Sequence, residues 1–403
     1  MRKTLGLAAL AAALVCGAAN AQQINVKIGV LTDMASLYAD DTGIGSVAAA
    51  KLAAQDFMKD HANFKVDVIS ADHQNKADIG TQIVNQWIDV EHVDMIADVP
   101  NSGVALAVSE VVKQKNKVFV ASGPASSDLT GPKCSPNTVH WTYDTWMLAN
   151  GTGNAIVKNG GDTWFFLPSD YAFGHALERD TMAVVKANGG KVLGAVRHPI
   201  NTSDFSSFLL QAQASKAKII GLANAGGDTI NAIKQGAEFG IVAGGQKFAG
   251  LLIFAPDVAA LGLKTAQGLQ FTETFYWDLN DGTRAWTKRW DKERNAAGKL
   301  PSMNMAGVYA GTLHYLKAVA AIKSAADGKA VVAEMKKLPT DDALFGKGSV
   351  RVDGRVLHPA YLFEVKKPEE SKYPGDLYHV RATIPANEAF RPLKDGNCPL
   401  ASG

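Results

Sequence analysis

Hydrophobic residues recur along the first part of the chain with two different periods. Residues 25–31 and 64–70 are short apolar runs, which are typical of strands buried in a parallel sheet. Between them, Val47, Ala50 and Phe57 recur at the spacing of one helix face. Further strands are expected at 93–98 and 117–121, and further helices at 79–87 and 104–112. This alternation predicts a parallel sheet with helices on both faces.

The same alternation starts again after a loop that contains Gly131, Pro132 and Pro136. Glycine and proline at this density interrupt regular structure. In the second series, helices are expected at 145–157, 173–187, 205–214 and 229–239, and strands at 163–167, 191–197, 218–222 and 247–253. The pattern therefore predicts two successive α/β units of similar size.

The last third of the chain departs from this pattern. Its periodicity predicts helices at 282–297, 303–323 and 331–337, followed by strands at 349–352 and 360–365. Asp353-Gly354 lies between these two strands and is a hairpin turn signal. Helices followed by a hairpin do not build a third parallel unit. We expect them to complete the first two units, so that the chain crosses between lobes more than once.

The composition is that of a globular protein, with 47% hydrophobic and 20% charged residues and a net charge of +2. No basic tail indicates a nucleic-acid partner. Arg2, Lys3, the apolar stretch 5–15 and the small residues Ala19 and Ala21 have the layout of a secretory signal peptide. We expect cleavage after Ala21, which leaves a mature chain from Gln22. A lipid-modified Cys16 is the alternative, and no later stretch is long enough to span a membrane.

Two cysteines, Cys134 and Cys398, remain in the mature chain. An even pair in an exported protein predicts one disulfide bond. Two free thiols are the alternative. A single bridge is too sparse to hold a fold of this length, so a hydrophobic core must do so.

Motifs for catalysis are missing from the sequence. Residues 43–48 match a dinucleotide-binding fingerprint, but they follow the first predicted strand too late for its tight turn. No phosphate-binding loop, nucleophile elbow or zinc-protease motif occurs, and the histidines have no metal-ligand spacing. We therefore expect no enzyme, no metal and no cofactor.

Polar and aromatic residues follow the predicted strands, where open α/β sheets bind their ligands. Ser102 and Ser122 follow strands of the first unit, whereas Asn224 and Asp228 follow a strand of the second. Helix N-termini in these loops present free N–H groups that suit a carboxylate. A role as a simple helix cap explains Ser102 as well as ligand binding does, and it explains Ser127 better. Two such edges facing each other would form a cleft.

Several short motifs resemble the substrate-binding proteins of bacterial ABC importers, in the branched-chain amino acid branch with the type I periplasmic-binding fold. They are IGVLTD at 28–33 with LYA at 37–39, SGP at 122–124 with DLT at 128–130, HWTYD at 140–144, YAFG at 171–174 and TSDFS at 202–206. Each is weak alone, but their order and spacing across the mature chain are specific. The resemblance implies an α/β fold of two doubly wound parallel-sheet lobes joined by three crossovers, which close on a ligand.

The resemblance also implies limits for each lobe. The expected segments are the signal peptide at 1–21, the first lobe at 22–143 and 274–343, the second lobe at 144–273 and 344–390, and a tail at 391–403 that returns to the first lobe. Hinge segments are then expected near Tyr143, Thr274 and Leu344.

Ligand positions carry over where the motifs match. Those expected from the first lobe are Tyr38, Ser102, Ser122, Gly123, Ala125, Ser126 and Tyr143. Those expected from the second lobe are Phe173, Asn224, Asp228, Phe254 and Asp257. Phe173 stands where the family often has tyrosine, and Ala255-Pro256 departs from the acidic pattern that holds an ammonium, so only Asp257 remains for that role.

The predicted ligand is a small carboxylate with an aromatic or other apolar body. Aromatic residues are expected on or near the strand ends, namely Tyr38, Tyr143, Phe173, Phe254, Phe275 and Tyr276. Such rings favour a ligand with a flat apolar body. A clear acidic partner for a ligand ammonium is lacking. A branched-chain or related amino acid is the alternative, and a ligand-sensing receptor domain is a second one. The expected protein is a periplasmic monomer whose partner is the membrane permease of an ABC importer.

Overall fold

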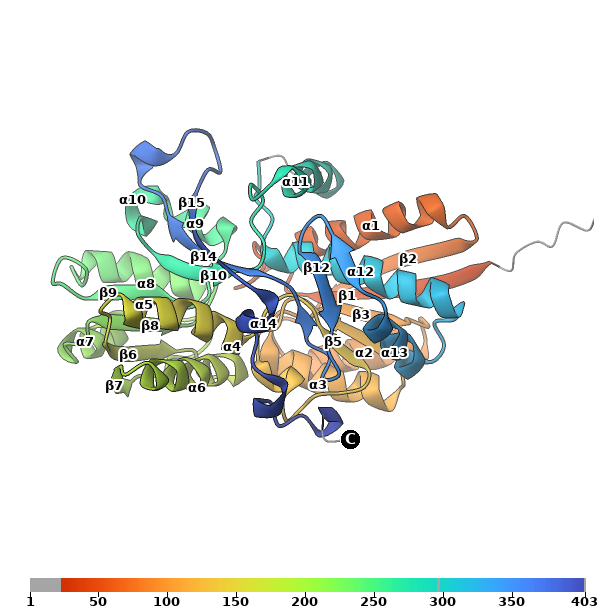
Figure 1. The fold of residues 1–403 in the computed structure, drawn as a ribbon, viewed down its shortest axis with the longest axis horizontal. Coiled ribbons are helices and arrows are strands. Elements are labelled where there is room, and N and C mark those ends of the chain that lie inside the picture. Colours follow the sequence, from red (N-terminus) through yellow and green to blue (C-terminus); the bar gives the residue numbers. More distant parts are fainter. Residues whose placement is uncertain (1–22, 296–297, 402–403) are drawn as a thin grey trace, which may run out of the picture.

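Two parallel sheets frame the chain in the computed structural model, which describes residues 23–295 and 298–401 (Figure 1). The first sheet has the strand order β2-β1-β3-β4-β5, and each strand is parallel to its neighbours. Its strands are β1 (Ile24–Thr32), β2 (Phe64–Asp72), β3 (Met95–Asp98), β4 (Val118–Ala121) and β5 (Thr138–His140). The helices between them are α1 (Gly43–Asp60), α2 (Ala77–Asp89) and α3 (Ser102–Gln114).

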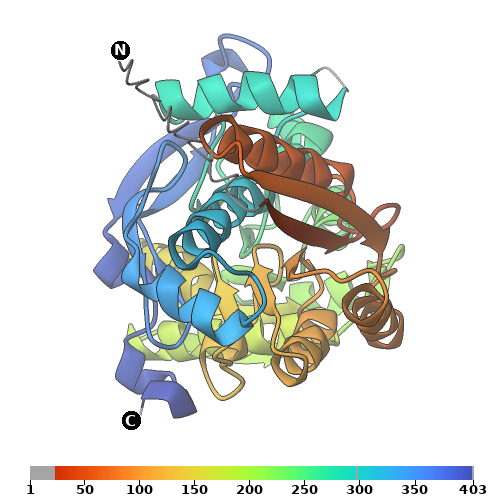
Figure 2. The ribbon, with the colours of Figure 1, turned by 90° about the vertical axis from the view of Figure 1, so that its right-hand side faces the viewer.

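Strand β4 shows why this sheet needs helices on both faces. Val118 and Val120 enter the hydrophobic cluster that includes residues of α1 and α12 (Met303–Ile322), whereas Phe119 and Ala121 enter the cluster of α2 and α3. Side chains of a strand point alternately to opposite faces, so a fully apolar strand must be covered twice. Helix α11 (Asp281–Arg294) lies beside α1 and helix α13 (Gly328–Lys337) beside α12, as Figure 2 shows.

The second sheet has the order β7-β6-β8-β9 and is also parallel throughout. Its strands are β6 (Thr163–Pro168), β7 (Lys191–Ala195), β8 (Ile219–Ala223) and β9 (Lys247–Gly250). The helices of this unit are α4 (Thr145–Leu148), α5 (Asn154–Lys158), α6 (Ala172–Ala187), α7 (Ser206–Ala214), α8 (Gly227–Glu238), α9 (Ala255–Leu261) and α10 (Leu263–Ala266). Helix α6 covers one face, and α7 and α8 cover the other. The predicted pair of doubly wound α/β lobes is confirmed.

The C-terminal strands are divided between two small antiparallel sheets. One has the order β10-β14-β15, with β10 (Gln270–Glu273), β14 (Ala360–Val365) and β15 (Tyr378–Ile384). The other has the order β11-β12-β13, with β11 (Thr340–Asp342), β12 (Gly346–Val350) and β13 (Val356–Leu357). A short helix, α14 (Ala386–Ala389), follows them.

The predicted hairpin between 349–352 and 360–365 is wrong in its second strand. Asp353-Gly354 does make the turn, with φ at +86° for Gly354, a conformation that glycine adopts without strain. The turn joins β12 to β13, however, and β14 pairs with β10 and β15 instead. The pairing with β10 joins segments far apart in the sequence, which a local turn signal does not encode.

Strands β12 and β13 fall within the predicted second-lobe segment 344–390 but lie beside the first sheet. His140 of β5 bridges to Arg355 in parallel, and its N–H donates to the Gly354 carbonyl at 2.8 Å. Strand β14 belongs instead to the hydrophobic cluster of the second lobe through Phe363. We therefore propose that the third crossover follows Leu357 rather than Leu344.

The C-terminal tail lies against the first lobe. Arg391 donates a hydrogen bond to the Ser127 carbonyl at 2.9 Å. Cys398 is joined to Cys134 by a disulfide bond, with 5.7 Å between their Cα atoms, inside the usual range of roughly 4.4–6.8 Å. The bridge therefore ties the tail to the loop that precedes the first crossover.

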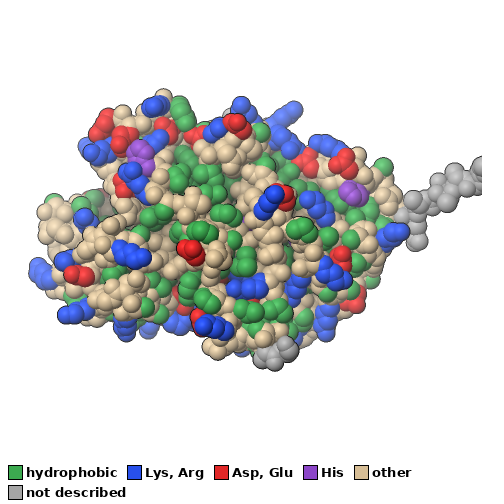
Figure 3. All heavy atoms as spheres, in the orientation of Figure 1, with side chains coloured by type: hydrophobic (Ala, Val, Ile, Leu, Met, Phe, Trp, Pro, Cys, Tyr) green, Lys and Arg blue, Asp and Glu red, His purple; other side chains and the backbone are tan. Residues whose placement is uncertain are grey.

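Within residues 23–295 and 298–401, no helix has the length and apolar character needed to cross a membrane. The predicted signal peptide at 1–21 and its alternative at Cys16 lie outside the described residues. Figure 3 shows basic and acidic side chains interspersed over the visible face, without a large area of one sign. Such a surface offers no extended patch for a polyanion on that face.

Candidate interlobe binding site

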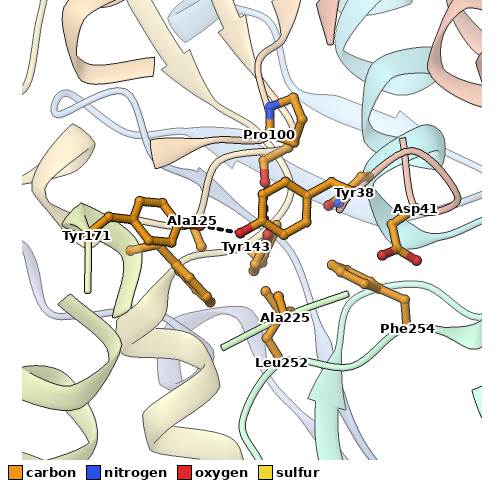
Figure 4. Close-up of a pocket in the computed structure, with 12 residues that line it drawn as sticks. Tyr38, Asp41, Pro100, Ala125, Tyr143, Tyr171, Ala225, Leu252 and Phe254 are labelled. Atoms are coloured by element: carbon orange, nitrogen blue, oxygen red, sulfur yellow. Dashed lines mark hydrogen bonds between the residues drawn. The ribbon is translucent and has the colours of Figure 1, made fainter. Parts of the chain in front are cut away.

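A narrow cavity lies between the two lobes, beyond the carboxyl ends of their parallel strands (Figure 4). Its free volume is about 10 Å³, roughly the space of one water molecule, so a larger ligand requires the lining residues to move apart. The lining residues from the first lobe are Tyr38, Asp41, Pro100, Gly123, Ala125, Tyr143 and Asn304, and those from the second are Tyr171, Phe173, Ala225, Leu252 and Phe254.

Aromatic rings from both lobes form most of the apolar wall. The Tyr38 and Tyr171 hydroxyls share a hydrogen bond of 2.5 Å across the lobes. Tyr143 packs edge-on against Phe254, with 6.4 Å between ring centroids, and its hydroxyl donates to the Gly123 carbonyl at 2.8 Å. Burial raises the pKa of Tyr38 and Tyr143. Both therefore remain neutral phenols at physiological pH.

Half of the predicted ligand residues line the cavity. They are Tyr38, Gly123, Ala125, Tyr143, Phe173 and Phe254. The missing hydroxyl at Phe173 is supplied nearby by Tyr171, whose ring lies 5.9 Å from that of Phe173. The structure thus brings the predicted aromatic residues of both lobes together.

The predicted carboxylate cradle lies directly behind Gly123 and Ala125. The buried Ser102 Oγ accepts hydrogen bonds from the N–H groups of Ala125 at 3.3 Å and Ser126 at 3.2 Å. Ser122 Oγ donates to Asp98 Oδ1 at 3.4 Å. Ser102, Ser122 and Ser126 are therefore placed together at the predicted edge of the sheet, but they lie one layer outside the cavity lining.

The predicted polar residues of the second lobe have structural partners and do not line the cavity. Asn224 donates to His198 Nε2 at 3.0 Å and accepts from Thr229 Oγ1 at 2.7 Å. The Asp228 carboxylate accepts two backbone N–H bonds, from Asn201 at 3.1 Å and Thr202 at 2.8 Å. Burial raises the pKa of Asp228 to about 7.

Asp257 caps the helix that follows Phe254 rather than facing the cavity. Its carboxylate accepts the Phe254 N–H at 3.0 Å, a favourable bond at a helix N-terminus. The predicted placement of Phe275 and Tyr276 at the cleft is also wrong. Phe275 packs on Trp286, and Tyr276 stacks on Tyr378 at 4.4 Å between centroids, so both rings belong to the cores of the lobes.

Two polar lining residues, Asp41 and Asn304, were not predicted from the sequence. Both side chains are 2% exposed. Asp41 precedes α1 next to another aspartate, where a carboxylate is usually solvated, and Asn304 begins α12 much later in the chain. The sequence offered only Asp257 as an acidic partner for an ammonium, whereas the acidic residue in the lining is Asp41. Nothing in the sequence around Asp40 and Asp41 predicts that the carboxyl group of Asp41 is buried.

A second polar contact joins the lobes at the first crossover. Asp180 Oδ2 on α6 accepts hydrogen bonds from Ser127 Oγ at 2.7 Å and Thr145 Oγ1 at 2.6 Å. The neighbouring Arg179 donates to Ser127 Oγ at 2.9 Å and pairs with Asp128 at 3.1 Å. Asp180 is 6% exposed, so these bonds are shielded from water and stabilise this arrangement of the two lobes.

Residues 25–372 match the family described as periplasmic binding protein. The chain belongs to the periplasmic binding protein family. A periplasmic binding protein of known structure from Burkholderia mallei is 49% identical, covers 93% of this chain and 99% of its own length, and superposes with a TM-score of 0.89. A branched-chain amino acid ABC transporter periplasmic ligand-binding protein from Burkholderia xenovorans is 39% identical, with coverages of 93% and 100% and a TM-score of 0.81.

More distant periplasmic binding proteins share the fold. A Leu/Ile/Val-binding protein homolog from Brucella melitensis is 25% identical over 83% of this chain and 90% of its own length. An ABC transporter solute-binding protein from R. palustris, solved in complex with 4-hydroxybenzoate, is 21% identical, with coverages of 90% and 97% and a TM-score of 0.79. Proteins of this family bind solutes and are not enzymes, which agrees with the expectation from the motifs.

Asp98 beneath the cavity gives this periplasmic binding protein a stability that depends on pH. Gly123 packs so closely on Asp98 that a Cβ there would lie 2.6 Å from Oδ1. Burial raises the pKa of Asp98 from 3.8 to about 7. The folded protein therefore keeps a proton that the unfolded chain loses, and the resulting penalty grows as pH rises from about 4 to about 7.

We expect Asp98→Asn to remove this penalty, because the amide stays neutral at every pH. Relative to the wild type, the variant's free energy of unfolding should rise by about 2–4 kcal/mol between about pH 4 and about pH 7.5. Urea unfolding at both pH values measures the difference. The exposed Asp67→Asn on β2 is the control. An equal pH dependence in wild type and Asp98→Asn would contradict the prediction.

Proposed function

We propose that the chain is the extracytoplasmic solute-binding component of an ABC importer. Support comes from its membership of the periplasmic binding protein family, from the names of its relatives and from the secretory layout of residues 1–21. The proposed location is the periplasm, with a mature monomer that starts at Gln22 and delivers its ligand to a membrane permease. Neighbouring genes for a permease and an ATPase would distinguish this role from that of a ligand-sensing receptor domain.

The proposed ligand is a small carboxylate with an aromatic or other apolar body. The observation that carries this proposal is the small cavity walled by Tyr38, Tyr143, Phe173 and Phe254, since aromatic walls favour flat apolar bodies. At one end, the cavity is lined by Gly123 and Ala125, which adjoin the predicted carboxylate cradle where Ser102 accepts the Ala125 and Ser126 N–H bonds. The hydroxybenzoate complex of the distant R. palustris protein indicates that the fold accommodates such acids.

A branched-chain or related amino acid is the second candidate. The names of the Burkholderia xenovorans and Brucella relatives favour it. The buried Asp41 in the lining also favours it, because a carboxyl group is the usual partner of a ligand ammonium. Asp257, which the sequence suggests as the partner of an ammonium, instead accepts a hydrogen bond from the Phe254 N–H.

Isothermal titration with benzoate, a hydroxycinnamate and leucine tests the ligand class. We expect micromolar or tighter binding of an aromatic acid and weak binding of leucine. Tight leucine binding without a response to either acid would overturn the proposed class in favour of the second candidate. Native mass spectrometry of freshly purified protein would identify any ligand that it retains.

We further propose that the ligand stabilises a closed form by contacting both lobes. The Tyr38–Tyr171 bond and the Asp180–Ser127 bond span the same interface, so they form only when the lobes meet. A ligand shifts such an equilibrium by its differential affinity for the closed form. Small-angle scattering should give a smaller radius of gyration with the bound acid, and an unchanged curve would contradict closure.

A further inference from the structure

The Asp41 carboxyl at one end of the cavity has an unsatisfied oxygen. Among residues 23–295 and 298–401, its Oδ1 is buried and has no hydrogen-bond partner. No lysine, arginine or histidine of these residues forms an ion pair with it, whereas the exposed neighbour Asp40 pairs with Lys299 at 3.5 Å. A buried acceptor without a donor costs roughly 1–3 kcal/mol. An occupant of the cavity that brings a donor would recover this free energy.

Asn304 presents a second unsatisfied acceptor next to Asp41. Its side-chain Oδ1 is also buried without a partner in the described part of the chain. Ser302 holds the two residues together, because its hydroxyl donates to the Asp41 carbonyl at 2.5 Å and accepts the Asn304 N–H at 3.1 Å. Two residues far apart in the sequence are thus fixed as a pair by the N-terminal cap of α12.

Asp41 lies away from the predicted carboxylate cradle, whereas the Asn304 side chain bonds to the Tyr143 hydroxyl, which donates to the Gly123 carbonyl. In Figure 4, the Asp41 carboxyl lies beside the Phe254 ring, and Ala125 lies on the other side of the Tyr38 ring. A ligand whose carboxylate is at Gly123 and Ala125 therefore directs the far end of its body toward Asp41. Groups that share one carbon with the carboxylate would remain at the cradle end.

We infer that Asp41, with the buried Asn304 oxygen as a second acceptor of the cavity, selects ligands that carry a hydrogen-bond donor, a hydroxyl or an ammonium, at the end of the body remote from the carboxylate. This inference rests on the proposed function and specifies its ligand class. Asp41 and Asn304 are then specificity-determining residues of the cavity. A site built to bond a donor discriminates strongly against the analogue that lacks it, because the acceptors are left unpaired.

The surroundings of Asp41 are compatible with both donors. Burial and the nearby carboxyls of Asp257, Asp40 and Glu273 raise the pKa of Asp41 well above its usual value. The Asp41 carboxyl therefore favours its neutral form more than an exposed aspartate does, and its carbonyl oxygen can accept from a hydroxyl. An ammonium would instead ionise Asp41 and form a buried ion pair.

Titration with three matched acids tests the inference. They are benzoate, 4-hydroxybenzoate and 4-(aminomethyl)benzoate, which differ only in the group remote from the carboxylate. We expect wild type to bind one of the two donor-bearing acids on the order of tenfold or more tighter than benzoate. Asp41→Leu should reduce this ratio to about one while benzoate binding persists. Asp40→Leu, a change at the adjacent exposed aspartate, should leave the ratio unchanged.

Two further variants sharpen the result. Asp41→Asn keeps an acceptor oxygen but no negative charge, so a preference for the hydroxyl should survive and a preference for the ammonium should disappear. Asn304→Leu should weaken the same preference independently, and thermal melting shows which variants are folded. Equal affinities for all three acids in wild type, or an unchanged ratio in folded Asp41→Leu and Asn304→Leu, would overturn the inference. Binding of none of the acids by wild type would instead refute the proposed function, and the inference with it.

Discussion

Replacing both Cys134 and Cys398 by serine is expected to lower the free energy of unfolding by about 3–5 kcal/mol. The bridge spans 264 positions, and in the chain-entropy account a longer loop removes more freedom from the unfolded chain. It also holds the tail where Arg391 bonds to the Ser127 carbonyl, next to the contacts that join the lobes. Urea unfolding of wild type and the double variant measures the loss.

Dithiothreitol provides the internal control for this experiment. The reductant should shift the unfolding midpoint of the wild type toward that of the double variant and leave the double variant unchanged. Mass mapping under non-reducing conditions should find the peptides of Cys134 and Cys398 joined. Free thiols at both positions, with equal midpoints for the two proteins, would contradict the prediction.

Ala225→Phe is expected to abolish ligand binding by filling the cavity. Ala225 follows β8, is 3% exposed and faces the space between the aromatic walls. A phenyl ring there and a ligand body cannot occupy the same small volume. The adjacent Gly226, with φ at +56°, packs on the Leu37 carbonyl of the other lobe, so the loop has little room to retreat. We expect a loss of at least about a hundredfold in affinity, or about 2.7 kcal/mol.

Ala187→Phe is the matched control for that variant. Ala187 is exposed at the end of α6 in the same lobe, so the same substitution there should leave affinity unchanged. Titration with the acid that wild type binds best compares the three proteins. Retained affinity in a folded Ala225→Phe protein would place the ligand outside this cavity.

The main elements of both lobes were predictable from the sequence because their signals are local. Strand β4 is an unbroken apolar run, and its two faces each need a helix layer. The restart of the pattern after Pro136 separated the lobes, and the parity of the cysteines gave the disulfide. Such features depend on residues within one element or on a simple count.

The aromatic half of the cavity was also predictable. Tyr38, Tyr143, Phe173 and Phe254 follow strands or lie at a crossover, and parallel sheets gather their strand ends at one edge. The polar half was not. Ser102, Asn224 and Asp228 stand at such ends too, but local hydrogen bonds engage them, and the sequence alone does not distinguish a capping residue from a ligand contact.

The contacts between segments far apart in the sequence became visible only in the folded structure. Asp41 and Asn304 become neighbours because Ser302, at the start of α12, reaches the backbone of the loop before α1. Tyr171 meets Tyr38 across the interface, and β14 leaves its expected hairpin partner for β10. Local periodicity specifies each helix and strand, whereas these contacts depend on the packing of distant segments. Local sequence patterns therefore specify the two-lobed framework and its aromatic cleft, and the packing of distant segments within the first lobe specifies the acceptor pair of Asp41 and Asn304.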